Sequence, residues 1–91
     1  QLHFDIAFVG VSGVSESGFY DYSLEDTEIK RALIEGSQKT VVLIDSSKFG
    51  RMSVARVCEL REVDLVVSDD APGPDLQVVL DAAGVEILIA N

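Results

Sequence analysis

The chain has 91 residues, 47% of them hydrophobic, a length that suits one small globular unit and excludes two domains. Seven Lys and Arg against sixteen Asp and Glu give a net charge of −9, which excludes nucleic-acid binding by this segment because an acidic surface repels phosphate backbones. The apolar runs fall far short of the roughly 18 residues that a membrane span needs, so the sequence predicts a soluble protein without a membrane partner.

Four short apolar runs rich in β-branched residues predict β-strands. The runs are mostly continuous rather than alternating, which is typical of strands that are covered on both faces in a parallel sheet. They occupy residues 6–11, 40–44, 63–67 and 85–90.

Segments with helical spacing separate these strands and predict three helices, over residues 23–38, 52–59 and 74–83. Ser23 stands where an N-cap is expected for the first. Pro74 suits the first turn of the third, and Gly84 suits its C-terminal cap. The alternation predicts an α/β fold: a mostly parallel four-stranded sheet with flanking helices.

Several residues argue against common catalytic or metal sites. Cys58 is the single cysteine, expected as a small buried hydrophobe on the second helix, and its lack of a partner fits a reducing compartment. His3 is the single imidazole, so neither a Ser-His-Asp triad nor a His-Cys zinc site can be assembled. Asp69 and Asp70 lack further ligands at a recognisable spacing. We therefore expect no metal and no cofactor.

The stretch Asp45-Ser-Ser-Lys48-Phe-Gly50 follows the second predicted strand. In open parallel sheets ligands bind beyond the carboxyl ends of the strands, so this polar turn is a candidate site. Lys48 offers a point charge for phosphate or carboxylate, Asp45 suits a sugar hydroxyl, and Ser47 adds a hydroxyl. The structural alternative also stands: a solvated lysine, with Asp45 capping the next helix.

The segment after the first predicted strand, residues 10–18, is long and rich in Gly and Ser. Its small residues, among them Gly10, Ser12 and Gly13, would let backbone N–H groups approach an anionic ligand. The segment matches neither a P-loop nor a dinucleotide-binding fingerprint. Two interpretations stay open: a flexible surface loop and a ligand-binding loop.

Together these elements resemble the C-terminal sensor domain of DeoR-family bacterial transcriptional repressors, over nearly the whole chain. Ser68 stands where that family more often has Thr. The resemblance rests on Asp45-Ser-Ser-Lys48-Phe-Gly50, Asp5-Ile-Ala-Phe-Val-Gly10, Gly18-Phe19 ahead of Glu28-Ile-Lys30, and Val63-Asp64 leading to Val67-Ser68-Asp69.

The resemblance implies part of the fold shared by ribose-5-phosphate isomerase and coenzyme A transferases. It implies a cytoplasmic, homo-oligomeric regulator, not an enzyme, that senses a phosphorylated sugar or sugar derivative. Residues 1–91 would be a single segment, about the C-terminal half of the sensor domain. The winged helix-turn-helix domain that binds DNA would lie outside this chain. Gly10, Asp45 and Lys48 match family positions at the expected pocket.

Two other functions fit parts of the pattern. A fragment of a sugar-phosphate isomerase would use Asp45 as proton acceptor and Lys48 to stabilise an enediolate, but no further acid or base is identifiable. A phosphoacceptor receiver domain would need an acidic pair after the first strand, where Gly10-Val-Ser12 stands instead.

Overall fold

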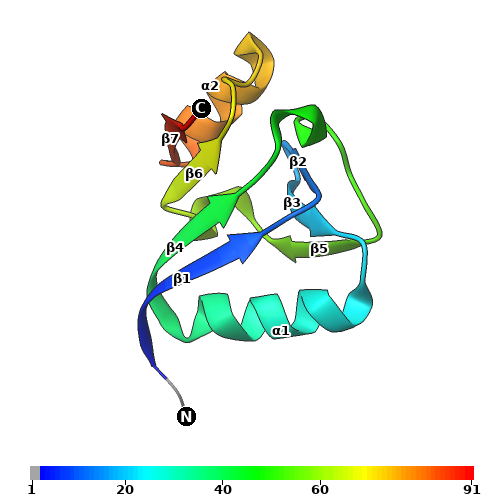
Figure 1. The fold of residues 1–91 in the computed structure, drawn as a ribbon, viewed down its shortest axis with the longest axis vertical. Helices are drawn as coiled ribbons and strands as arrows, with labels where there is room; N and C mark the ends of the chain where they lie inside the picture. The colour runs from blue at the N-terminus through cyan, green and yellow to red at the C-terminus, as the bar shows by residue number, and fades with distance from the viewer. Residues whose placement is uncertain (1–2) are drawn as a thin grey trace.

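The computed structural model describes residues 3–91, and its largest element is a four-stranded sheet, sheet A (Figure 1). The spatial order is β1-β4-β6-β7 and every neighbouring pair is parallel, which confirms the predicted parallel sheet. Each predicted strand overlaps one observed strand. The bounds are β1 (Phe4–Gly10), β4 (Ser37–Leu43), β6 (Leu65–Ser68) and β7 (Glu86–Ile89).

Residues 3–91 contain two α-helices, α1 (Leu24–Glu35) and α2 (Pro74–Ala82). The side chain of Ser23 caps α1 by accepting a hydrogen bond from the backbone N–H of Asp26 at 3.2 Å, as the sequence predicts. The helix ends earlier than the predicted residue 38, because β4 already begins at Ser37. Neither helix is long and apolar enough to cross a membrane, a statement that covers residues 3–91.

A second sheet, sheet B, was not predicted. It is antiparallel in the order β2-β3-β5, with β2 (Gly13–Ser15), β3 (Gly18–Asp21) and β5 (Ala55–Cys58). The predicted helix over residues 52–59 is therefore wrong. The backbone of residues 55–58 forms its hydrogen bonds with β3 instead of within a helix. Strand pairing therefore outweighs the helical spacing of the apolar residues in this stretch. Cys58 is buried as expected, but on a strand.

Residues 10–18 contribute to this sheet, which overturns the flexible-loop interpretation. Gly13 begins β2 and Gly18 begins β3, and both are buried. A Cβ atom at Gly13 would lie 2.5 Å from the carbonyl oxygen of Arg51. At Gly18 it would collide with the carbonyl oxygen of Cys58, and φ is +137°. Close backbone packing therefore accounts for these two glycines.

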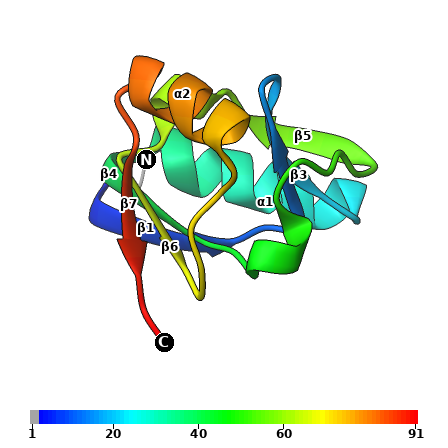
Figure 2. The same ribbon diagram turned by 90° about the horizontal axis from the view of Figure 1, so that it is seen from above.

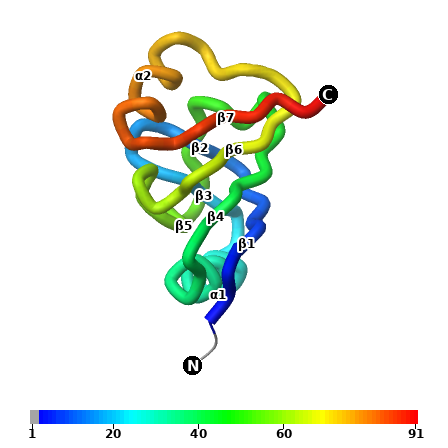
Figure 3. The backbone as a smooth tube through the Cα atoms, turned by 90° about the vertical axis from the view of Figure 1, so that its left-hand side faces the viewer, coloured from blue at the N-terminus to red at the C-terminus, as the bar shows by residue number. Residues whose placement is uncertain are grey.

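The hydrophobic core lies between the two sheets. Val9 and Val42 of sheet A meet Phe19 and Val57 of sheet B, and Leu80 of α2 completes this layer. Both helices and sheet B gather on one side of sheet A (Figures 2 and 3). The fold therefore covers one face of the parallel sheet and leaves the other bare.

Candidate functional site

The carboxyl ends of the sheet A strands meet at one edge, as predicted. The backbone N–H of Val11 bonds to the carbonyl of Leu43 at 3.2 Å, and the N–H of Ile44 bonds to the carbonyl of Val67 at 3.1 Å. A shallow depression of about 520 Å³ lies at this edge. Its lining comes from the ends of β4, β6 and β7: Leu43, Ile44, Asp45, Val67, Ser68, Asp69 and Ala90.

The polar stretch after β4 forms a short 3₁₀ turn, η1 (Ser46–Lys48). Asp45 caps this turn, because its carboxylate accepts a hydrogen bond from the N–H of Ser47 at 2.9 Å. That bond lowers the pKa of the Asp45 carboxyl, so the group stays ionised at neutral pH. Asp45 was expected to cap the next helix, over residues 52–59; that helix is absent from the described residues, and the exposed Asp45 side chain caps this 3₁₀ turn instead.

A second carboxylate, Asp69, fixes the same turn from the end of β6. It accepts hydrogen bonds from the backbone N–H of Ser46 at 2.7 Å and from the Ser46 hydroxyl at 2.9 Å. The backbone bond is the main reason that the pKa of Asp69 is lowered. Sequence reasoning weighed Asp69 as a metal ligand and counted it in the family resemblance, but it missed this role because nothing in the spacing relates Asp69 to Ser46.

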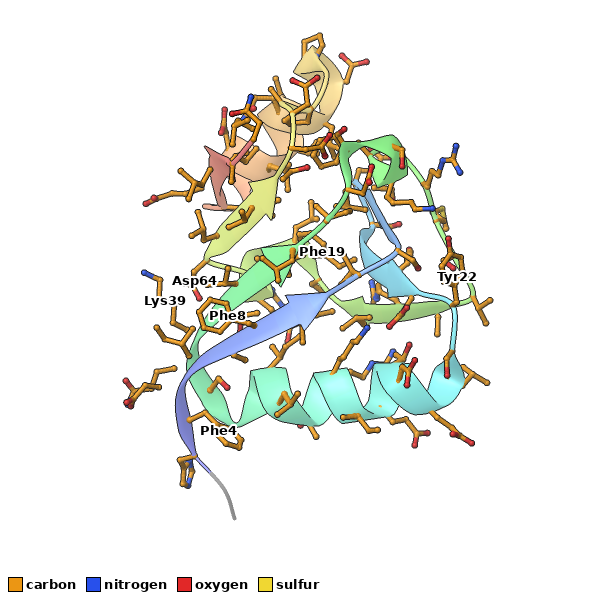
Figure 4. All side chains as sticks on the ribbon, viewed as in Figure 1. Phe4, Phe8, Phe19, Tyr22, Lys39 and Asp64 are labelled. Atoms are coloured by element: carbon orange, nitrogen blue, oxygen red, sulfur yellow. The ribbon has the colours of Figure 1, made fainter. Side chains whose placement is uncertain are left out.

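Lys48 ends the turn with its ammonium beside Tyr22, which follows β3. The Nζ atom donates to the Tyr22 hydroxyl at 3.1 Å and lies 5.8 Å from the ring centroid. Tyr22 is exposed, and Figure 4 shows it at the sheet B side of the molecule. The ion pairs among residues 3–91 are Lys30–Asp21 and Arg61–Glu59, and Lys48 belongs to neither. Sequence reasoning missed Tyr22.

The remaining predicted site residues lie in or beside the hairpin of sheet B. Ser12 directs both its N–H, at 2.9 Å, and its hydroxyl, at 3.3 Å, to the carbonyl of Tyr20. Gly13 packs against Arg51, while Gly10 is exposed at the end of β1. The structure thus brings Asp45, Ser47 and Lys48 together in one turn. Ser12 and Gly13 lie in the adjoining hairpin. Both hydrogen-bond donors of Ser12, its N–H and its hydroxyl, are already used by the carbonyl of Tyr20.

An ion pair that the sequence did not reveal supports this edge. The ammonium of Lys30, on α1, contacts the carboxylate of Asp21 and also donates to the carbonyl of Gly10 at 2.6 Å. Asp21 is buried and additionally accepts from the N–H of Tyr22 at 2.8 Å. Lys30 therefore ties the end of β1, the end of β3 and α1 together.

The backbone also joins η1 to sheet B. The N–H of Gly50 donates to the carbonyl of Val14 at 2.8 Å, and Phe49 forms a parallel bridge with Val14. Phe49 packs against the core, and Gly50 turns the chain with φ of +78°. The ammonium-bearing turn and the glycine-serine hairpin therefore lie at the same end of the molecule.

Comparison with known proteins agrees with this architecture. Residues 1–70 match the family described as the DeoR C terminal sensor domain. The chain is 38% identical over 91 residues to the HTH-type transcriptional repressor GlcR of Bacillus subtilis, covering 100% of this chain and 35% of GlcR.

Two further relatives match over shorter stretches. The deoxyribose operon repressor of Escherichia coli K12 is 41% identical over 69 residues, covering 75% of this chain and 27% of the repressor. The glycerol-3-phosphate regulon repressor of Haemophilus influenzae is 34% identical over 73 residues, covering 79% of this chain and 29% of that protein. The chain thus spans about a third or less of the length of these relatives. It belongs to the DeoR C-terminal sensor domain family.

Proposed function

We propose that this chain is part of the effector-binding domain of a DeoR-type transcriptional regulator and that it contacts a phosphorylated sugar or sugar derivative. The matched relatives are named as repressors, and two of those names mention deoxyribose and glycerol-3-phosphate. Both names mention a small molecule that carries hydroxyl groups, and one of the two molecules is a phosphate ester, so we propose a ligand that combines hydroxyl groups with a phosphate.

The observation that carries the proposal is the position of Lys48. Its ammonium lies on the turn after β4, and its hydrogen-bond partner there is the hydroxyl of Tyr22 and not a carboxylate. Lys30, by contrast, is already paired with Asp21. An ammonium without a carboxylate partner retains its charge for an anionic ligand, and lysine serves phosphate as a compact point charge.

The other predicted residues take supporting roles in this proposal. Asp45 and Ser47 offer an acceptor and a hydroxyl to the sugar part of the ligand. The end of β1 at Gly10 is open, since a Cβ there would meet nothing nearer than the carbonyl of Leu43 at 4.0 Å, and a ligand could approach the backbone at this point. Ser12 and Gly13 fix the hairpin on which the turn rests. The rest of the binding groups would come from the part of the regulator outside this chain.

In the complete regulator, effector binding would favour one arrangement of the sensor domain. Only a difference in affinity between two arrangements can shift their populations, and this shift would reach DNA through a separate winged helix-turn-helix domain. Association of several protomers belongs to the same proposal. The acidic chain itself would make no contact with DNA, given its net charge of −9.

Calorimetry with matched ligand pairs tests the proposal. The protein to be used is a hybrid of GlcR, in which the 91 residues of this chain replace the matching region of GlcR. We call this protein the GlcR hybrid. The ligands are deoxyribose 5-phosphate against deoxyribose, and glycerol 3-phosphate against glycerol. Lys48→Ala should weaken binding of a phosphorylated ligand by at least about tenfold, or about 1.4 kcal/mol, and leave its neutral counterpart unaffected.

Lys39→Ala is the control, because Lys39 is an exposed lysine on the same strand that precedes the site, nearer the amino end of β4. It should leave both members of each pair unchanged. Equal losses for phosphorylated and neutral ligands, or no loss with Lys48→Ala, would remove Lys48 from phosphate recognition. If no sugar phosphate binds to the hybrid, the ligand class itself is wrong.

A further inference from the structure

The hydrogen bond between Lys48 and Tyr22 has a fixed direction. A lysine ammonium carries donors and no acceptor, whereas a tyrosine hydroxyl both donates and accepts. In the 3.1 Å contact the Nζ atom is therefore the donor and the tyrosine oxygen is the acceptor. The phenolic proton is not used by this bond, so it remains available to a second acceptor. The adjacent ammonium also polarises the O–H bond, which makes the hydroxyl a stronger donor.

The Tyr22 side chain is open to a ligand and lies close to the ammonium. Tyr22 is 62% exposed, and Figure 4 shows it at the outer margin of the molecule. Its ring centroid lies 5.8 Å from Nζ of Lys48, a distance at which the aromatic face attracts a cation. The ring and the hydroxyl therefore both hold the tyrosine beside the lysine.

Separate parts of the fold hold the two residues in place. The backbone N–H of Tyr22 donates to the buried carboxylate of Asp21 at 2.8 Å, and that carboxylate is paired with Lys30 of α1. Lys48 stands on η1, which Asp69 fixes from the end of β6. A ligand would therefore meet both donors already in position, and this lowers the entropy that is lost on binding.

We infer that the Tyr22 hydroxyl and the Lys48 ammonium bind two oxygens of the same phosphate group, an arrangement that we call the Tyr22–Lys48 clamp. This inference rests on the proposed function, to which it adds Tyr22 as a phosphate-binding residue. A phosphate group presents several acceptor oxygens, so donors 3.1 Å apart can each bond to a different one. The bond from the phenol to a charged oxygen is roughly twice as strong as one to a neutral sugar hydroxyl.

Removing the hydroxyl while keeping the ring tests the clamp. In the GlcR hybrid, Tyr22→Phe should weaken binding of deoxyribose 5-phosphate by at least about fivefold in calorimetry and leave binding of deoxyribose unchanged. Tyr20→Phe is the matched control, because the chain has two tyrosines and the Tyr20 hydroxyl is bonded to the hydroxyl of Ser17 at 2.6 Å. It should leave both ligands unchanged. A merely structural role of Tyr22 would instead weaken both ligands alike.

Inorganic phosphate tests the clamp without a sugar. In the 91-residue chain, an isotope label at Cζ of tyrosine, the atom that carries the hydroxyl, gives an NMR signal that Tyr22→Phe assigns by its loss. The Tyr22 signal should move saturably as sodium phosphate is added and stay in place in sodium chloride of equal ionic strength. Lys48→Ala should abolish the response, and the Tyr20 signal should stay in place throughout.

The two measurements separate failure of the clamp from failure of the proposed function. If deoxyribose 5-phosphate binds and Lys48→Ala weakens it but Tyr22→Phe does not, the clamp is overturned and the proposed function stands. If no sugar phosphate binds to the hybrid but the Tyr22 signal responds to inorganic phosphate, the clamp stands and the ligand class is wrong. A Tyr22 signal that phosphate leaves in place overturns the clamp, whether or not the hybrid folds.

Discussion

The carboxylate of Asp69 holds the backbone N–H and the hydroxyl of Ser46, at 2.7 Å and 2.9 Å, and so links the loop after β6 to the turn after β4. Asp45 caps the same turn through the N–H of Ser47. Two ionised carboxylates therefore determine the conformation in which Lys48 is presented. Both groups act as hydrogen-bond acceptors here, and neither pairs with the lysine.

This geometry predicts a loss of stability in acid. The folded-state pKa of Asp69 lies below the unfolded value of about 3.9, so its contribution is complete above that pH and disappears as the pH falls through the folded value. Asp69→Asn should therefore lower stability at pH 7, and the difference from the native chain should shrink below about pH 4. Urea unfolding at both pH values measures it. Asp5→Asn, at an exposed position, is the control; a difference that stays constant with pH would contradict the assignment.

The two ion pairs differ in burial, so replacing Lys30 should lower the free energy of unfolding more than replacing Arg61. Only 9% of the Asp21 side chain and 24% of the Lys30 side chain are exposed, so Lys30→Met would leave a buried carboxylate without its partner. We expect a cost of about 2 to 4 kcal/mol in the free energy of unfolding. Arg61→Met breaks a pair whose side chains are 78% and 46% exposed and should cost less than about 1 kcal/mol. Denaturant midpoints of the two variants should separate clearly, and equal midpoints would refute the difference.

The glycines predict a third contrast. Gly13→Ala places a Cβ atom 2.5 Å from the carbonyl oxygen of Arg51 and should destabilise the chain by about 1 to 3 kcal/mol, because one of the two backbones must move. Gly10→Ala meets its nearest atom at 4.0 Å and should change stability by less than about 0.5 kcal/mol. Thermal unfolding compares the two. A negligible loss for Gly13→Ala would show that the hairpin accommodates a side chain at position 13.

The parallel sheet was predictable because its strands are marked by continuous apolar runs, and the carboxyl-edge position of Asp45 and Lys48 follows from it. Sheet B was not predictable in the same way. Its strands have three or four residues each, too short for a period to be read, and the Gly and Ser residues of the hairpin read as a loop. Close packing against Arg51 and Cys58 explains the glycines at positions 13 and 18.

The contacts that complete the site were also beyond sequence reasoning. Lys48 and Tyr22 are 26 positions apart, and Ser46 and Asp69 are 23 apart. Local periodicity describes neighbours three or four residues away on a helix, or two away on a strand, so it carries no information about such pairs. They become visible only when the topology has brought the strand ends together.

The bridge between Val14 and Phe49 has a mechanical consequence. Through Asp69, the Ser46 turn is fastened to the parallel layer, and through the N–H of Gly50 it is fastened to the antiparallel layer. A displacement of Lys48 would therefore strain the hydrogen bonds to both sheets at once. Because the turn couples the two sheets, a force on Lys48 would be transmitted to both of them.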